Sequence, residues 1–146
     1  MRAYRFAYPA ALAAAEEGGF VVSFRDVPEA ITQGDDEAEA LSEGVDALDE
    51  AIAARIKHGD DIPPPSPVKH GERLVAVPAL TAAQAVLYLA MREQGVTKSE
   101  LARRLGTTPR EAARLTDPRH PSKIARIEAA LAVLGHALEV GSRKVA

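Results

Sequence analysis

Alternating apolar residues predict two strands near the start of the chain. The alternating positions are Tyr4, Phe6 and Tyr8 in residues 3–8, and Phe20, Val22 and Phe24 in residues 20–26. A period of two is typical of a strand with one buried face. The turn-forming residues 17–19 lie between the two segments, so we expect an antiparallel hairpin. A short third strand is expected at 30–34, after the break made by Pro28.

The spacing then changes to that of one long amphipathic helix. Asp36, with Glu39 three residues later, is a capping-box pattern at its start, and Gly59 is placed to end it. Its apolar stripe recurs every three or four residues, at Leu41, Val45, Leu48, Ile52 and Ile56. The opposite side, which we call the acidic face, carries Glu43, Asp46, Asp49 and Glu50.

A proline-rich segment, residues 60–71, separates this helix from a last strand expected at 73–77. Consecutive prolines favour an extended and rather stiff backbone. The favoured interpretation is a rigid crossover back to the edge of the sheet, and a ligand for an SH3 domain is the alternative. The first half of the chain is therefore predicted to be a small β-β-β-α-β domain.

The second half carries helix signals. Residues 80–95 predict a helix with Thr81 as its N-cap and Gln84 at the capping-box position. Two short helices follow, at 99–105 and 109–115, and Gly106 lies in the turn between them. Each begins with a T-x-x-E capping box, at Thr97 and Thr108 respectively.

A last helix is expected after Ser122, which is placed to cap it, and Gly135 is placed to end it. Its apolar stripe consists of Ile124, Ile127, Leu131 and Leu134. An additional short strand is expected in the tail, at 136–142.

Composition places the chain among folded proteins. It has 146 residues, 47% of them hydrophobic and 27% charged. Five of the six aromatic residues lie in the first 24 positions, so one early core is expected to take them all. The absence of cysteine excludes disulfides, and no apolar run approaches the ~20 residues of a membrane span. Without a signal-peptide pattern, we expect a cytoplasmic protein.

Charge divides the chain into two unlike halves. Residues 1–78 carry 7 Lys and Arg against 15 Asp and Glu, a net charge of −8. Residues 79–146 carry 11 against 6, a net charge of +5. An acidic half followed by a basic half suggests two different partners. Chance scatter over a solvated surface is the alternative.

The two short helices and their turn have the pattern of a helix-turn-helix. Such a unit places the start of its second helix in the major groove of DNA, and here that start carries Arg110 and Arg114. The candidate DNA-contacting residues are Lys98, Ser99, Arg103, Thr107, Thr108, Pro109, Arg110, Glu111, Arg114, Arg119, Ser122 and Lys123. The alternative is a small helical bundle whose Lys and Arg side chains only keep its surface in contact with water. Since one such unit contacts few base pairs, a homodimer or higher homo-oligomer is expected.

Several segments resemble HicB-type antitoxins. Residues 8–10 (YPA), 16–48 (EEGGFVVSFRDVPEAITQGDDEAEALSEGVDAL) and 62–66 (IPPPS) resemble the N-terminal part of that family. Residues 96–140 resemble the helix-turn-helix form found in it. The resemblance spans nearly the whole chain, in the expected order.

The resemblance implies a partner and a fold. HicB-type proteins pair with a small HicA toxin, an RNA-cleaving enzyme, and repress the operon that encodes both. The expected fold class is α+β. Residues 1–78, including the proline-rich segment, would form a partial RNase H-like domain that neutralises the toxin, and residues 79–146 an all-α helix-turn-helix domain that binds operator DNA.

No catalytic site, cofactor or metal site is expected. RNase H chemistry needs several carboxylates around two metals. Within the motif Asp26 is the only acidic residue placed near a strand end, since Asp35 and Asp36 fit turn and cap roles. The acidic domain is instead expected to attract a basic toxin, with Asp26, Glu29 and the acidic face as candidate contacts. A stand-alone regulator with an N-terminal sensing or oligomerisation domain is the main alternative, and a metal-dependent nuclease is another.

Overall fold

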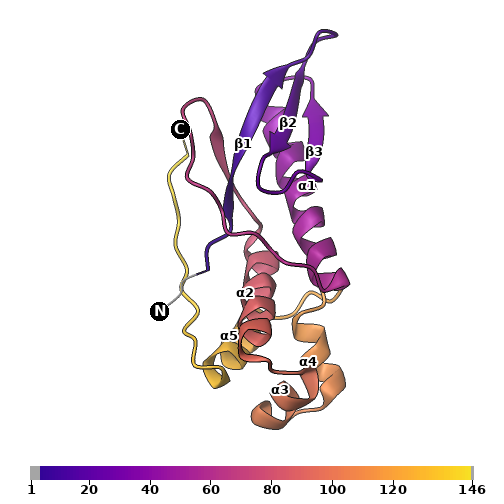
Figure 1. Ribbon diagram of the computed structural model, residues 1–146, viewed down its shortest axis with the longest axis vertical. Helices are drawn as coiled ribbons and strands as arrows, with labels where there is room; N and C mark the ends of the chain where they lie inside the picture. Colours follow the sequence, from indigo (N-terminus) through magenta and orange to yellow (C-terminus); the bar gives the residue numbers. More distant parts are fainter. Residues whose placement is uncertain (1–3, 146) are drawn as a thin grey trace.

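The computed structural model describes residues 4–145 and confirms the α+β class (Figure 1). The strands are β1 (Ala7–Ala14), β2 (Phe20–Phe24), β3 (Ile31–Gly34) and β4 (Arg73–Ala76), and the helices are α1 (Glu37–His58), α2 (Ala79–Gln94), α3 (Lys98–Leu105), α4 (Pro109–Leu115) and α5 (Ile124–Val133). The strands pair antiparallel in the order β3-β2-β1-β4, and α1 covers one face of the sheet. The sheet lies at one end of an elongated molecule, and α3 and α4 lie at the other.

The first strand begins later than predicted. We expected a strand at 3–8, but β1 starts at Ala7 and runs through an alanine-rich stretch to Ala14. Alanine is a weak strand former, so this stretch gave no sequence signal. Its register is set by pairing, with Ala10 opposite Phe24 of β2. Ala3 lies outside the described residues.

Four of the five early aromatic residues share one core, and Tyr4 does not. Tyr8 and Phe24 are buried, and Phe6 and Phe20 pack partly buried against the same cluster. Tyr4 instead stacks on His136 in the tail, and its hydroxyl donates a hydrogen bond to the carboxylate of Glu93 near the end of α2. The prediction of a single core for all five was therefore wrong.

The long helix forms as predicted. The Asp36 side chain accepts a hydrogen bond of 2.8 Å from the backbone N–H of Glu39, and Gly59 ends α1 in the left-handed conformation at φ 73°. Leu48, Ile52 and Ile56 of the stripe are buried against the sheet. Leu41 and Val45 pack partly buried beside them.

The proline-rich segment runs from α1 back to the sheet edge, where β4 pairs with β1, as predicted. It is fixed to the domain by polar contacts. The Tyr8 hydroxyl donates to the carbonyl of Pro63 at 2.7 Å. Burial, with the negative charge of Asp26, raises the pKa of Tyr8, so this donor stays protonated. Asp26 accepts from both the backbone N–H and the hydroxyl of Ser66, at 2.8 and 2.6 Å.

The C-terminal helices enclose a second core and share α2 with the first. Leu87 and Met91 of α2 pack with Leu101, Leu115 and Ile127. In the same helix, Ala85 is buried in the first core, and Tyr88 and Leu89 pack against that core. Helix α2 is therefore the joint between the two halves of the molecule.

Two predicted caps and the predicted tail strand were wrong. Helix α2 begins after Pro78 without a side-chain cap, so Thr81 lies inside it. Helix α5 begins after Lys123, and the Ser122 hydroxyl donates to the carbonyl of Arg114 instead. In the described tail, residues 136–145 form no strand and run back along the molecule, where Arg143 donates to the carbonyl of Leu74 (Figure 1).

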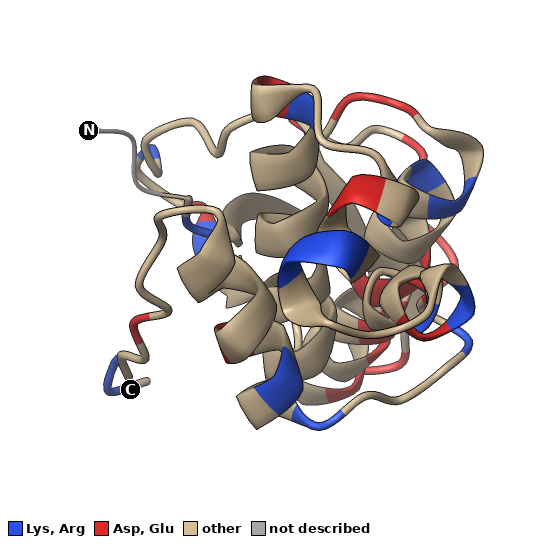
Figure 2. Ribbon diagram, turned by 90° about the horizontal axis from the view of Figure 1, so that it is seen from below, with Lys and Arg blue, Asp and Glu red and all other residues tan. Residues whose placement is uncertain are grey.

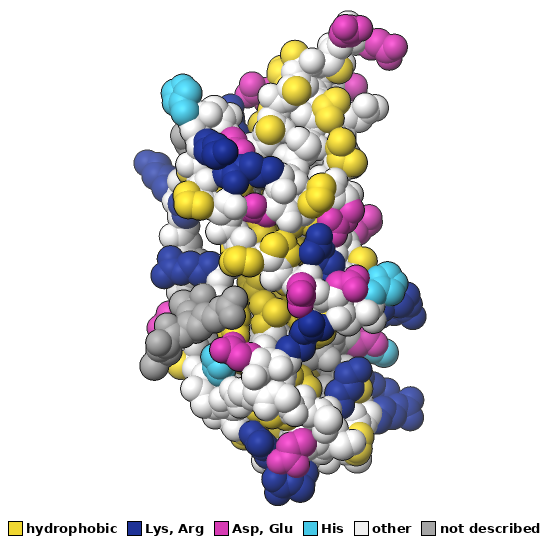
Figure 3. Space-filling view, viewed as in Figure 1, with side chains coloured by type: hydrophobic (Ala, Val, Ile, Leu, Met, Phe, Trp, Pro, Cys, Tyr) yellow, Lys and Arg dark blue, Asp and Glu magenta, His cyan; other side chains and the backbone are white. Residues whose placement is uncertain are grey.

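The sheet face opposite α1 is largely neutral at the surface. Figure 3 looks onto the strands from that side and shows apolar side chains over them. Ile31 of β3 is 61% exposed. None of the helices within residues 4–145 combines the length and the apolar composition needed to cross a membrane.

At Gly34, the backbone of β3 lies close to the backbone of α1. A Cβ atom there would lie 2.3 Å from the backbone nitrogen of Ala40 and 2.6 Å from its Cα. Because the obstacle is backbone, Gly34→Ala is expected to lower the free energy of unfolding by about 3 kcal/mol in urea denaturation. Gly141→Ala is the control, since a Cβ there meets nothing within 4 Å. Equal stability of the two variants would contradict the close approach.

Candidate functional site

Two short helices, α3 and α4, are set against each other by caps and small residues. Thr97 accepts from the backbone N–H of Glu100 at 3.1 Å, and Thr108 accepts from that of Glu111 at 3.2 Å. Gly106 ends α3 with φ 68°, which lets the chain turn directly into α4. The facing side chains are buried, and Ala102 and Ala112 among them are small enough for close crossing, as predicted. The capping boxes in the sequence thus gave both helices correctly.

Most candidate DNA-contacting residues lie at the surface of this end of the molecule (Figure 2). Lys98, Ser99, Arg103, Thr108, Pro109, Arg110, Glu111, Arg114, Arg119 and Lys123 are exposed, and Thr107 and Ser122 are half-buried. Lys98 and Ser99 line an open hollow of about 650 Å³ together with Thr116 at the end of α4. The start of α3 and the end of α4 therefore meet at one surface.

Five of these cations have no acidic partner in the part of the chain that the structure describes. They are Lys98, Arg110, Arg114, Arg119 and Lys123. An exposed guanidinium or ammonium group without an internal partner keeps its full charge for an external anion. Figure 2 views the molecule from this end and shows Lys and Arg on the nearest helices.

Arg103 is different, because a carboxylate on its own helix already holds it. Its guanidinium donates to both oxygens of Glu100, and Arg104 donates to the same carboxylate. These hydrogen bonds, from Arg103 first and Arg104 second, lower the pKa of Glu100 to about 2. Glu100 is therefore charged at any physiological pH, and Arg103 has less of its charge to offer than Arg114.

Glu111 is also engaged within the protein. Its carboxylate lies 3.3 Å from the guanidinium of Arg126 on α5. The pair links the first turn of α4 to α5. Sequence patterns did not indicate Arg126, because the two residues are distant along the chain and only the folded bundle brings them together.

The segment between α4 and α5 is anchored by Gln84, which the sequence placed at a helix cap. Gln84 is buried, and its side-chain amide donates to the carbonyls of Asp117 and His120, at 3.1 and 3.3 Å. The Ser122 hydroxyl fastens the far end of the segment to α4. Arg119 and Lys123 are therefore presented from a fixed backbone.

The candidate toxin contacts fall into two groups. Glu43, Asp46 and Glu50 of the acidic face are exposed, with no ion pair inside residues 4–145. Asp49 is half-buried, and its Oδ1 atom is buried with no hydrogen-bond partner among the described residues.

The second group is used to hold the domain together. Glu29 receives hydrogen bonds of 2.5 and 2.9 Å from the Arg55 guanidinium, which lower the pKa of the Glu29 carboxyl. Asp26 holds Ser66 of the crossover, as described above. These two carboxylates have internal partners, whereas Glu43, Asp46 and Glu50 are available to a partner protein. Within residues 4–145, no three His, Asp or Glu side chains come together so as to hold a metal ion.

Comparison with known proteins gives a consistent result across most of the chain. Residues 7–86 match the family model described as HicB-like antitoxin of bacterial toxin–antitoxin systems. The chain is 40% identical over 131 residues to "Antitoxin HicB 1" of Photorhabdus laumondii, covering 90% of this chain and 83% of the relative. It is 38% identical over 133 residues to "Antitoxin HicB" of Escherichia coli K12, covering 91% and 96%.

Removing the Gln84 amide tests how the segment between α4 and α5 is held. Gln84→Met keeps the volume but leaves the carbonyls of Asp117 and His120 without their donor. We expect the free energy of unfolding to fall by about 2 kcal/mol and the His120 amide to exchange faster with deuterium. Gln33→Met, at an exposed position of β3, is the control. Unchanged exchange at His120 would show that Gln84 does not hold the segment.

Proposed function

Since the chain belongs to the HicB-like antitoxins of bacterial toxin–antitoxin systems, we propose that it inhibits a HicA-type toxin and represses its own operon. The N-terminal domain, residues 1–78, would bind the mRNA-cleaving toxin. The C-terminal domain, residues 79–146, would bind operator DNA. In this function the protein is not an enzyme and needs no cofactor, and it acts in the cytoplasm, where both targets are found.

The observation that carries the DNA-binding proposal is the set of five unpaired cations around α3 and α4. We take these helices as a helix-turn-helix, with α4 as the helix that enters the major groove. Arg110 and Arg114 are four residues apart and so lie on one face of α4, where arginine can pair bidentately with guanine. Lys98, Arg119 and Lys123 flank that face and are suited to backbone phosphates.

The remaining residues of the predicted DNA surface have supporting roles. Ser99, Thr107, Thr108 and Pro109 bring the starts of α3 and α4 up to the phosphates, where free backbone N–H groups donate. Arg103 and Glu111 are tied to Glu100 and Arg126, so they contribute less than the unpaired cations. One such unit covers few base pairs, so a homodimer or higher homo-oligomer would occupy adjacent half-sites.

The acidic face of α1 supports the toxin-binding proposal. A protein that binds RNA needs a basic surface, and exposed unpaired carboxylates attract such a surface and compete with RNA for it. Glu43, Asp46 and Glu50 meet this description, and Asp49 lies beside them on the helix. Asp26 and Glu29 position the crossover and the end of α1, and they act at the edge of this surface.

The DNA-binding proposal predicts a graded response to arginine removal. Arg110→Ala and Arg114→Ala should each weaken binding to a promoter-region duplex by about 1–3 kcal/mol, because each loses a contact to a base. Arg103→Ala should weaken binding by less, since Glu100 already offsets the charge of Arg103. Arg143→Ala, in the tail beside β4, should bind like the unaltered protein. Fluorescence anisotropy gives the affinities, and equal losses in all four variants would contradict the assignment of α4.

The toxin-binding proposal predicts a partner encoded nearby. Co-expression with a short basic protein from the neighbouring gene should restore growth and give a stable complex. The double substitution Glu43→Lys with Asp46→Lys should weaken that complex at least about ten-fold at physiological salt. Glu16→Lys with Glu17→Lys, in the exposed turn before β2, is the matched control. If the Glu43 and Asp46 substitutions weaken the complex no more than the control substitutions do, the toxin binds elsewhere on the protein.

A further inference from the structure

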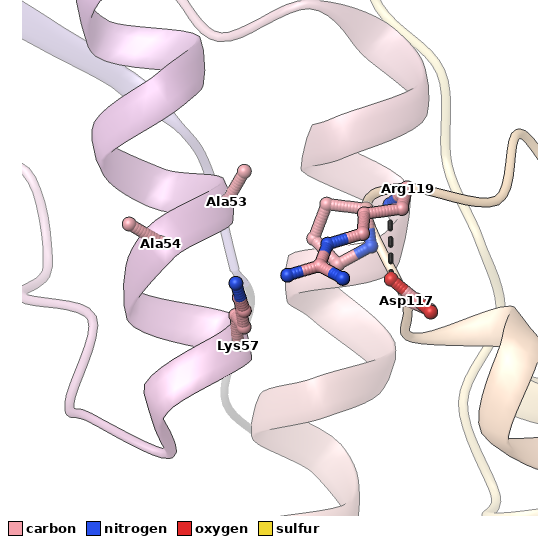
Figure 4. Close-up of a pocket in the computed structure, with 6 residues that line it drawn as sticks. Ala53, Ala54, Lys57, Asp117 and Arg119 are labelled. Atoms are coloured by element: carbon pink, nitrogen blue, oxygen red, sulfur yellow. Dashed lines mark hydrogen bonds between the residues drawn. The ribbon is translucent and has the colours of Figure 1, made fainter.

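A hollow of about 220 Å³ lies where the first domain meets the second (Figure 4). One side is the last part of α1, with Ala53, Ala54 and Lys57. The other side is the segment after α4, with Asp117, Pro118 and Arg119. The charged groups that line the hollow are therefore the cations of Lys57 and Arg119 and the carboxylate of Asp117.

Lys57 and Arg119 point toward each other across this hollow (Figure 4). Neither side chain has an acidic partner anywhere in residues 4–145. The Asp117 carboxylate lies on the side of Arg119 away from Lys57 (Figure 4), where it accepts a hydrogen bond of 2.9 Å from the backbone N–H of Arg119 and lies 3.7 Å from a ring nitrogen of His120. Two facing cations repel each other, so the gap favours an anion that contacts both.

The surroundings hold the backbone segments that carry both cations. Gln84 fixes the carbonyls on either side of Arg119, as shown above. On the other side, Tyr88 of α2 donates to the carbonyl of Asp60 at 2.7 Å, and Arg92 pairs with Asp61 at 2.8 Å. These contacts tie the chain just after α1 to α2. The hollow is therefore held from both sides by one helix.

The position of the hollow indicates which anion it meets. Figure 1 shows the C-terminal end of α1 directly above α4, with the segment 117–123 between them. The same segment carries Lys123, a further unpaired cation next to the start of α5. A duplex lying along α4 would carry its sugar-phosphate backbone past this segment. A phosphodiester also has the single negative charge and the multiple acceptor oxygens that a lysine and an arginine can share.

We propose that Lys57 and Arg119 together bind a backbone phosphate of the DNA that α4 contacts, so that the toxin-neutralising domain takes part in DNA binding. This inference rests on the DNA-binding function proposed above. It extends the DNA footprint beyond the helical domain, onto the last turn of a helix that carries the acidic face further towards its start. A lysine in the last turn of a helix is also favoured by the helix dipole, and that role alone would leave DNA affinity unaffected by its loss.

The test uses the full chain and a duplex of about 30 base pairs, roughly three helical turns, from the region upstream of its gene. Affinity is measured by fluorescence anisotropy over a series of salt concentrations. Loss of one phosphate contact should weaken binding about five-fold at 0.15 M salt and reduce the slope of log K against log salt by about 1. We expect both effects in Lys57→Gln and in Arg119→Gln. The fold-loss of DNA affinity in the double variant should be smaller than the product of the two single fold-losses, because both side chains hold one phosphate.

Matched variants separate the possible failures. Lys69→Gln removes an exposed lysine of the same domain, four residues before β4, and should bind like the unaltered chain. If Lys57→Gln also binds like the unaltered chain while Arg114→Ala is weakened, the inference is wrong and the DNA-binding function stands. If the unaltered chain does not bind the duplex, the proposed function itself fails.

Free phosphate is the other source of the same anion. Calorimetric titration with inorganic phosphate should show no saturable binding below millimolar concentration, because two exposed cations without further donors bind a lone phosphate weakly. Tight phosphate binding that Lys57→Gln abolishes, with DNA affinity unchanged, would overturn the assignment to DNA. Circular dichroism spectra of all variants confirm that each is folded.

Discussion

Helix α2 is the constraint on which the arrangement of this molecule depends. Its residues pack into both hydrophobic cores, with Ala85 in one and Leu87 and Met91 in the other. A helix that is apolar on more than one face has to be covered on each of them. The two halves are therefore not independent domains joined by a flexible linker, since separating them would expose one face of α2 to water.

The same helix sets the position of the polar groups around it. Gln84 holds the segment after α4, and Tyr88 and Arg92 hold the chain after α1. Internal pairing then determines which charges remain available. Exposed ion pairs add little stability. The pairing of Arg103 with Glu100 matters mainly because it offsets the positive charge of Arg103, whereas Arg114 keeps its own charge. Within residues 4–145, the cations that stay available to an external anion are therefore determined by where the carboxylates lie as well as by where the cations lie.

Local patterns in the sequence predicted the elements that local interactions determine. Helices α1 and α3 were predicted correctly because a capping side chain marks the start of each and a glycine marks its end. Helix α4 was predicted correctly because the Thr108 side chain caps its start and Pro109 follows at the first helical position. The alanine-rich part of β1 gave no signal, because only its pairing with β2 makes it a strand. Gln84 was assigned to a cap because its pattern fits one, and its actual partners are more than 30 residues away. The cations of the candidate site could be listed from sequence, but which of them are unpaired depends on contacts between helices.

With the toxin and the duplex proposed above, helix α1 would contact two partners of opposite charge, which is possible because its charges are separated along its length. At 1.5 Å per residue, Glu50 lies about 10 Å from Lys57 along the axis and Glu43 about 21 Å. The Debye length at physiological salt is about 8 Å, so these carboxylates only weakly reduce the attraction of Lys57 for a phosphate. The same screening keeps Lys57 from weakening the attraction of Glu43 and Asp46 for a basic partner. Because α1 is a single rigid element packed on the sheet, a toxin on its acidic face and a duplex at its end would be held at a fixed separation.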